Sequence, residues 1–230
     1  MRVAVFDLDG TLADTSADLI AAANAALSTG RWQGRLDPVV DAAVAFAGGR
    51  AMLRHVIDPE GTGGLEAEVD ALFPVLLEQY ANNLSTHTRL YAGVEDVLET
   101  LATTGWTLAV CTNKPTDLAV RLLEDLGIGA AFAALLGADS LPVRKPDPRH
   151  LTETVTQAGG DPGRSLLVGD TITDLRAARA ARMPCILVGF GPGGAKARQL
   201  GADAVIQHFR DLPGAISELG IEARHGSDGT

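Results

Sequence analysis

Short apolar runs, each followed by polar residues or glycine, recur along most of this chain. Six runs have the length of a strand and are apolar throughout rather than alternating with polar residues. Such runs are typical of parallel strands that are buried on both faces of a sheet. They lie at residues 3–6, 107–111, 134–137, 165–168, 184–188 and 204–206.

Between several of these runs, apolar residues recur at the three- and four-residue spacing of a helix. The clearest stretches are 93–104 and 117–126, and the alanine-rich stretch 174–182 has the same spacing. Strands that alternate with helices favour the α/β class, with a mostly parallel sheet and helices on both faces.

The stretch from about residue 13 to residue 90 breaks this alternation. Four stretches look helical, at 18–27, 38–46, 51–57 and 65–82, and no strand pattern is recognised among them. The segment is too long for a simple connection, so we interpret it as a helical insertion after the first strand. Ligands of open α/β sheets bind at the carboxyl ends of the strands, where this insertion would act as a lid. The predicted organisation is a core at 1–13 and 91–222, a helical cap at 14–90 and a flexible tail at 223–230.

Composition and charge narrow the class of partner. The chain has 230 residues, of which 46% are hydrophobic, and a net charge of -10. An acidic surface repels nucleic acid and anionic membranes, so neither is expected as a partner. We expect a monomer or a homodimer that binds a small molecule.

The cysteines and the amino terminus predict a cytoplasmic protein. Cys111 and Cys185 both lie in apolar, strand-like runs, which favours buried thiols in a reducing compartment. No signal peptide precedes the first apolar run, and no uncharged stretch is long enough to span a bilayer.

Two aspartates, Asp7 and Asp9, directly follow the first apolar run in the sequence DLDGT. Carboxylates two residues apart can point the same way, and a close pair tends to separate into one ionised and one protonated group. That division suits a nucleophile and a general acid/base. A loop pair of this kind can also do no more than cap a turn or a helix.

Asp170 and Asp174 follow another apolar run in the sequence GDTITD. Their oxygen donors suit a hard divalent cation. Asp174 has a second interpretation as the N-cap of the following helix, and both roles can hold together.

Three further polar residues lie close to strand ends. Thr112 and Asn113 offer a hydroxyl, an amide and backbone N–H groups for a phosphate, although the same residues could form only a turn into Pro115. Lys145 lies in the sequence VRKPDP, and a lone loop lysine is usually solvated.

A charge count connects these sites. Ionised Asp7, Asp170 and Asp174 would contribute about -3, and a phosphate monoester would add about -2. A divalent cation and Lys145 together supply +3. Binding of a phosphate at this cluster therefore calls for a metal.

Four motifs in this order resemble the haloacid dehalogenase-like superfamily, and within it the phosphoglycolate phosphatases. They are DLDGTLADT, TNKP, RKPDP and GDTITD, and SADLIAAANAALSTG resembles the entry to the family's cap. The resemblance covers nearly the whole chain. It implies a Rossmann-like core with a helical cap and a Mg²⁺-dependent phosphatase, with 2-phosphoglycolate as the expected substrate.

The resemblance also implies roles for individual residues. Asp7 would be the nucleophile that becomes phosphorylated, and Asp9 the general acid/base. Mg²⁺ would be held by the Asp7 carboxylate, the Asp9 backbone carbonyl and Asp170, with Asp174 supporting these ligands. The phosphoryl oxygens would be held by Thr112, Asn113 and Lys145.

The chain departs from the family pattern at a few positions outside these motif residues. The family often has histidine at Asp147 and glycine at Arg182, and its cap loop often reads Gly-x-Gly where this chain has 47-AGG-49. Selectivity is expected from the cap, with Gly49 and Arg50 as the first candidates and Arg54 or Arg35 as others.

Several alternatives stay open at this stage. A β-phosphoglucomutase-like enzyme would keep all four motifs, and so would a phosphatase for another small metabolite. A dehalogenase would lack Asp9. A phosphoacceptor signalling domain would take its acidic residues from different strands and lack the helical insertion, and a non-enzymatic binding protein would have no need of all these groups together.

Overall fold

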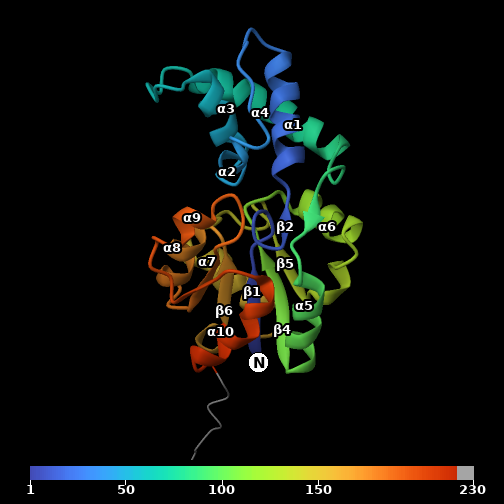
Figure 1. Ribbon diagram of the computed structural model, residues 1–230, viewed down its shortest axis with the longest axis vertical. Helices are drawn as coiled ribbons and strands as arrows, with labels where there is room; N and C mark the ends of the chain where they lie inside the picture. Colours follow the sequence, from blue (N-terminus) through green and yellow to red (C-terminus); the bar gives the residue numbers. More distant parts are fainter. Residues whose placement is uncertain (222–230) are drawn as a thin grey trace, which may run out of the picture.

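The computed structural model describes residues 1–221. A six-stranded parallel sheet lies at the centre of its larger part (Figure 1). The strand order is β5-β4-β1-β6-β7-β8, which confirms the predicted α/β class. The predicted tail at 223–230 lies outside the described residues. The strands are β1 (Arg2–Phe6), β4 (Trp106–Cys111), β5 (Ala134–Leu136), β6 (Leu166–Gly169), β7 (Cys185–Val188) and β8 (Ala204–Ile206).

Helices cover both faces of the sheet, because alternate side chains of each strand point to opposite faces and both sets are apolar. Ala4 and Phe6 of β1 belong to one core cluster, and Val3 and Val5 to the other. The first cluster includes side chains of α5 (Val94–Thr103), α6 (Thr116–Asp125) and α10 (Leu212–Glu218). The second includes α7 (Pro148–Gln157), α8 (Ile172–Ala180) and α9 (Gly194–Ala197). Short 3-10 turns lie at η1 (Gly129–Ala131), η2 (Pro162–Arg164) and η3 (Phe209–Asp211).

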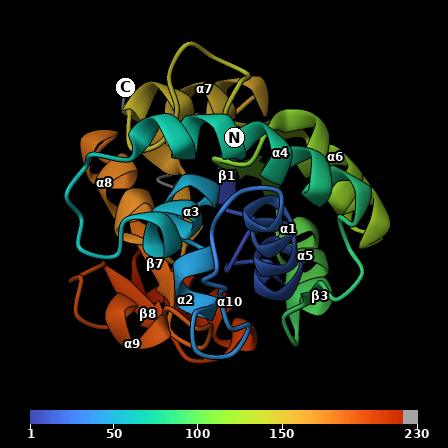
Figure 2. The ribbon, with the colours of Figure 1, turned by 90° about the horizontal axis from the view of Figure 1, so that it is seen from above.

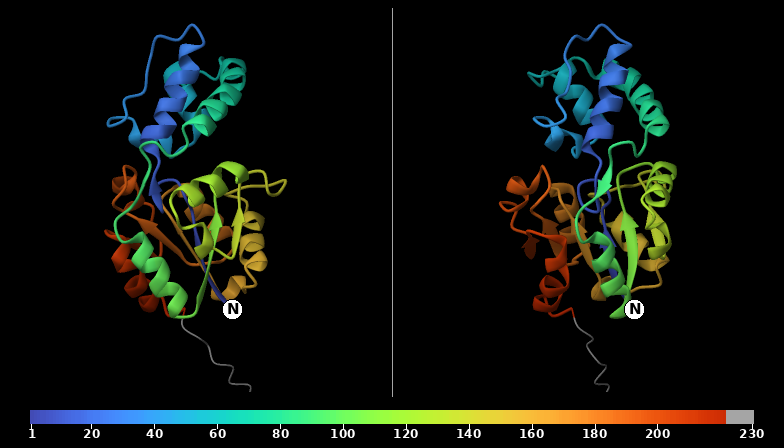
Figure 3. Two further views of the ribbon diagram at one scale, coloured as in Figure 1. Left: turned by 90° about the vertical axis from the view of Figure 1, so that its right-hand side faces the viewer. Right: turned by 45° about the vertical axis from the view of Figure 1, so that its right-hand side comes forward.

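A layer of helices lies above the carboxyl ends of the strands, as Figures 1 and 3 show. Seen from above in Figure 2, these helices lie over the sheet. Their own apolar side chains, among them Leu27, Met52 and Leu76, are buried between them. The helices are α1 (Ser16–Ser28), α2 (Ala42–Ala45), α3 (Gly49–Ile57) and α4 (Glu66–Asn82). The predicted helical insertion is therefore present on the side of the sheet where ligands bind.

A two-stranded ribbon joins the helical layer to the sheet domain. It pairs β2 (Ala13–Asp14) with β3 (Arg89–Leu90) in antiparallel fashion. Nearby, the buried Asp18 carboxylate accepts hydrogen bonds from the backbone N–H groups of His87 and Thr88 at 2.8–3.0 Å. The sequence interpretation found no strand here, because two residues are too few to show a period and their partners lie far along the chain.

Helices α7, α9 and α10 were not predicted and α2 is shorter than predicted; in α2 and α7, polar side chains compete with the apolar pattern. The stretch 38–46 was predicted helical throughout, but α2 contains only Ala42–Ala45. The Asp37 carboxylate accepts from the N–H groups of Val39 and Val40 at 2.8 and 2.9 Å, which forms a turn instead. Helix α7 was not predicted, since its buried side includes the polar residues His150 and Thr154.

Arg182, just after α8, has φ 56° in the left-handed region. This conformation costs about 1–2 kcal/mol for a residue with a Cβ and almost nothing for glycine. We expect Arg182→Gly to raise the free energy of unfolding by about 1 kcal/mol in urea titrations. Arg176→Gly, the same change inside α8, should lower it by about 1 kcal/mol. Equal losses in both variants would contradict this account of the backbone.

No helix within residues 1–221 combines the length and the apolar character needed to cross a membrane.

Candidate active site

Three central strands end level with one another and deliver three polar residues to one edge of the sheet. Phe6 of β1 is in register with Val110 of β4 and Val168 of β6. Asp7 is the next residue after β1, and its N–H donates to the Val168 carbonyl at 2.9 Å. Thr112 and Asp170 follow the other two strands in the same way. The apolar runs of the sequence thus fix where these side chains lie.

Lys145 brings a buried positive charge to this edge. Its side chain is 1% exposed, and Nζ lies 2.6 Å from Asp174 Oδ1 and 3.1 Å from Asp7 Oδ1. Burial alone would lower the pKa of Lys145, but Asp174 and Asp7 together raise it above its usual value. The lysine therefore stays charged, and it is not the solvated loop residue that its position in the sequence allowed.

Asp7 is buried and lies close to several charged side chains. Its Oδ1 accepts a hydrogen bond from the Leu8 N–H at 2.7 Å. Burial is the largest cause that raises its pKa to about 6, Lys145 opposes the rise, and Asp174 and Asp9 add to it. The Asp7 carboxylate is thus more costly to ionise here than in water unless another cation is nearby.

Asp7, Asp170 and Asp174 place carboxylate oxygens within 4.8 Å of one another. Burial, followed by repulsion from Asp174 and Asp7, raises the pKa of Asp170 well above its usual value. Thr11 Oγ1 donates to Asp170 Oδ1 at 3.2 Å. Clustered hard oxygen donors that repel one another are the arrangement that suits a divalent cation such as Mg²⁺.

Asp174 connects the buried lysine to the start of α8. Thr171 is the N-cap of that helix, and Asp174 is its third residue. Asp174 Oδ2 accepts from the Thr171 backbone N–H at 3.1 Å, which completes a capping box, and it also accepts from Thr171 Oγ1 at 2.6 Å. The interpretation of Asp174 as the N-cap was therefore wrong. Burial raises the pKa of Asp174, but Lys145 and Thr171 lower it by more. The pKa is therefore below its usual value, and the carboxylate is ionised.

Thr112 and Asn113 lie beside Asp7 in the loop before α6. The Thr112 side chain is buried, and its hydroxyl accepts from the Lys114 N–H at 3.2 Å. Asn113 Nδ2 donates to the Lys145 carbonyl at 2.9 Å, which joins this loop to the loop of Lys145. Both residues line a cavity that also contains Asp7.

Lys114 and Tyr80 are site residues that the sequence interpretation missed. Lys114 is 6% exposed, and its Nζ lies 2.7 and 2.9 Å from the two carboxylate oxygens of Asp9. The same ammonium donates to the Tyr80 hydroxyl, on cap helix α4, at 2.8 Å. Lys114 is part of TNKP, so its place in the motif was visible. Its burial was not, because it depends on a tyrosine distant in the sequence.

Two cavities meet at Asp7, between the sheet edge and the helical layer. One, of about 130 Å³, contains Asp9, Thr112 and Lys114 in its wall. The other, of about 360 Å³, contains Lys145, Asp170 and Asp174. The nucleophile candidate thus has the carboxylate cluster on one side and Asp9 on the other.

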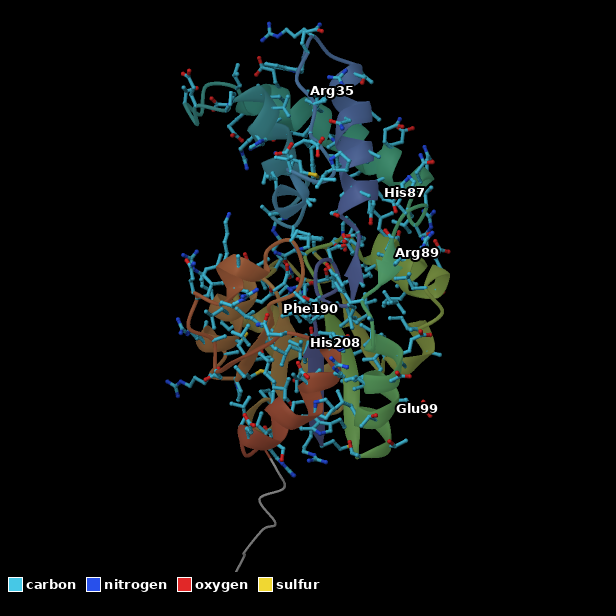
Figure 4. The ribbon with its side chains drawn as sticks, in the orientation of Figure 1. Arg35, His87, Arg89, Glu99, Phe190 and His208 are labelled. Atoms are coloured by element: carbon cyan, nitrogen blue, oxygen red, sulfur yellow. The ribbon has the colours of Figure 1, made fainter. Side chains whose placement is uncertain are left out.

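The cap residues proposed for selectivity divide between the cavity and the surface. Gly49 lines the smaller cavity, whereas Arg50 pairs with Asp70 and lies over the Phe73 ring at 4.6 Å. Arg54 pairs with Glu66 at 2.6 Å. Arg35 lies near the outer end of the helical layer, away from the sheet edge, in Figure 4. None of the three arginines is part of either cavity wall as described.

A family model described as haloacid dehalogenase-like hydrolase matches residues 4–188. The chain belongs to this family. The match spans the residues at the three strand ends and the helical layer, so the resemblance seen in the four motifs is confirmed.

Two relatives and one solved structure are similar to nearly the whole chain. The phosphoglycolate phosphatase of Mesorhizobium japonicum is 38% identical over 96% of this chain and 97% of its own. That of Agrobacterium fabrum is 40% identical over 94% and 92%. The crystal structure of a predicted phosphoglycolate phosphatase from Haemophilus somnus is 27% identical, with a TM-score of 0.77 over 93% of this chain and 97% of that chain.

Proposed function

We propose that this protein is a Mg²⁺-dependent phosphatase that cleaves small phosphate monoesters through a phosphoryl-aspartate at Asp7. The observation that carries the proposal is the position of Asp7. Its carboxylate lies where the two cavities meet, 3.1 Å from the buried ammonium of Lys145 and beside the cluster with Asp170. A nucleophile at this junction has charge-stabilising groups on one side and an acid/base on the other.

The residues present divide the reaction into two steps. Asp7 attacks phosphorus while Asp9, in the smaller cavity, protonates the leaving oxygen. Asp9 then takes a proton from the water that hydrolyses the phosphoryl-aspartate. Lys145, Thr112 and Asn113 hold the phosphoryl oxygens and stabilise the charge that develops on them.

The donor set at the sheet edge fits a divalent cation. The Asp7 and Asp170 carboxylates and the Asp9 backbone carbonyl would hold it, and Asp174 would orient Lys145 beside them. When bound, Mg²⁺ would neutralise charge on the phosphoryl group and favour the ionised form of Asp7. Since Lys145 offsets about one negative charge here, the remaining carboxylates and a phosphate of about -2 still call for the cation.

Two observations support 2-phosphoglycolate as the substrate. Two relatives that carry the name phosphoglycolate phosphatase are 38 and 40% identical over nearly the whole chain. The cavity on the Asp9 side, at about 130 Å³, suits a small leaving group better than the sugar of a mutase. We expect a screen of phosphorylated metabolites with Mg²⁺ to give the highest kcat/KM for 2-phosphoglycolate. A sugar phosphate at the top of the screen, or isomerisation without phosphate release, would contradict this assignment.

Removal of the metal, or of its ligand, should abolish turnover. Asp170→Asn is expected to lose the rise in melting temperature on addition of Mg²⁺, because its carboxylate no longer holds the cation. A ligand at about 100 times its Kd stabilises a fold by about 2.7 kcal/mol, so the shift is measurable by calorimetry. Without metal, the variant should be at least as stable as the wild type, since one of the buried, mutually repelling carboxylates becomes neutral.

Asp117→Asn, on the exposed side of α6, is the matched control and should keep the full Mg²⁺-dependent shift. Exhaustive chelation should also stop hydrolysis of an aryl phosphate by the wild type. Full activity without metal, or an undiminished shift in Asp170→Asn, would refute the assignment of the metal site.

A cytoplasmic location is part of the same proposal. Cys111 and Cys185 are free and buried, as predicted for thiols in a reducing compartment.

A further inference from the structure

The leaving group of the proposed reaction must lie in the smaller cavity. In an in-line displacement, the bond from the Asp7 oxygen to phosphorus forms opposite the phosphorus–oxygen bond that breaks. The leaving oxygen must also come within hydrogen-bond reach of Asp9, which supplies its proton. Asp9 is part of the smaller cavity wall and not of the larger one. This step rests on the proposed function.

The smaller cavity contains one cationic side chain, Lys114, among the described residues of its wall. The ammonium is buried between the sheet domain and the cap, where it lies against Asp9 and the Tyr80 hydroxyl. Several wall residues are apolar, including Leu19, Phe73 and Leu76. An anionic group on the leaving alcohol would lie beside this ammonium, with little competition from water.

Lys114 uses all three of its N–H groups in this structure, and the Tyr80 hydroxyl keeps its own hydrogen for an anion. Lys114 directs two of its N–H groups to the two oxygens of one carboxylate, that of Asp9. One of these N–H groups becomes free when Asp9 turns an oxygen to the leaving group. The Tyr80 oxygen accepts from Lys114, and no acceptor for its own hydrogen is found among the described residues. Burial and the nearby Asp9 and Asp18 raise the pKa of Tyr80, so the phenol keeps its proton.

We infer that Lys114 and Tyr80 form a subsite for a carboxylate on the leaving group. The class of substrate is a phosphate monoester whose carboxylate is separated from the ester oxygen by a single carbon, as in 2-phosphoglycolate. That short spacing brings the carboxylate to the ammonium that already contacts Asp9. Because Tyr80 is carried by α4, the subsite needs the cap in the position seen here. Selectivity thus comes from a core lysine and a cap tyrosine, not from the surface guanidinium of Arg50.

The test compares 2-phosphoglycolate with 2-phosphoglycolamide, a neutral amide of nearly the same shape. We measure the ratio of kcat/KM for the acid to that for the amide, with Mg²⁺ in the assay. Lys114→Met should lower this ratio by about 10- to 100-fold, the value of a charge-assisted hydrogen bond. Tyr80→Phe should lower it less, because a neutral donor is lost and the ammonium remains. Lys114→Arg should keep most of the ratio, since it retains the charge.

Three outcomes would overturn the subsite. The first is an unchanged ratio in Lys114→Met, and equal losses on both substrates would then mean that the lysine acts only through Asp9. The second is a wild-type ratio near one, and the third is a ratio that collapses in Arg50→Gln instead.

A binding measurement on the wild type keeps the inference testable if Lys114→Met does not fold. Glycolate should bind at least about 10-fold more tightly than glycolamide, for the same charge-assisted contact, and equal affinities would overturn the subsite. Absence of turnover on every phosphate ester would refute the proposed phosphatase, and the glycolate-to-glycolamide ratio would still decide the subsite.

Discussion

Replacing Asp7 with asparagine is expected to lower kcat by about four orders of magnitude or more, as loss of a nucleophile does in other enzymes. The amide has nearly the shape of the carboxylate but cannot attack phosphorus. Circular dichroism and chemical unfolding should show an intact fold, because Lys145 keeps its contact with Asp174 at 2.6 Å.

The change in stability from wild type to Asp7→Asn has an expected direction that can be measured. Burial raises the pKa of Asp7 to about 6 in the folded protein, above its value of 3.8 as a free side chain. The ionised carboxylate therefore costs free energy in the metal-free native state at neutral pH. The variant should be no less stable than the wild type at pH 7 without metal. Asp117→Asn is the matched amide control and should turn over normally. Retention of a tenth of the wild-type kcat in Asp7→Asn would exclude Asp7 as the nucleophile.

Lys145→Met is expected to be the most destabilising of these changes and to remove activity as well. It removes the ammonium that contacts two carboxylates, those of Asp7 and Asp174, whose side chains are 13% and 0% exposed. Breaking a buried ion pair by removing one partner typically costs about 3–5 kcal/mol. Urea unfolding in metal-free buffer at pH 7 measures this loss, and kcat/KM on 2-phosphoglycolate measures the catalytic effect.

Two companion variants separate charge from packing. Lys196→Met removes an exposed lysine and should change the free energy of unfolding by less than about 0.5 kcal/mol. Adding Asp174→Asn to Lys145→Met should restore part of the stability, because one stranded charge is gone, but none of the activity. A loss below about 1 kcal/mol in Lys145→Met would contradict a buried ion pair of this kind.

The sheet and the residues at its edge were predictable from the sequence because they depend on local signals. Strands buried on both faces are apolar throughout, and the polar residue after each strand lies at the carboxyl edge. The positions of Asp7, Thr112 and Asp170 follow from this rule. The side of the sheet on which the helical insertion lies follows from its place in the first connection.

Features that depend on contacts between distant segments were not predictable. The burial of Lys114 requires Tyr80 of the cap, and the ribbon of β2 and β3 pairs residues at the two ends of the insertion. The position of the Arg50 side chain also depends on contacts with distant residues. Its place beside Gly49 suggested a substrate contact, but its side chain finds Asp70 and Phe73 within the cap.

Chemical trapping of the intermediate tests most directly whether Asp7 becomes phosphorylated. The wild type is mixed with 2-phosphoglycolate and Mg²⁺, quenched in acid during turnover and treated with borohydride, which reduces an acyl phosphate to an alcohol. Peptide mass spectrometry then locates the modified residue. We expect homoserine at position 7, dependent on both substrate and metal. Modification of a different side chain, or steady hydrolysis with position 7 unmodified, would contradict a phosphoryl-aspartate at Asp7.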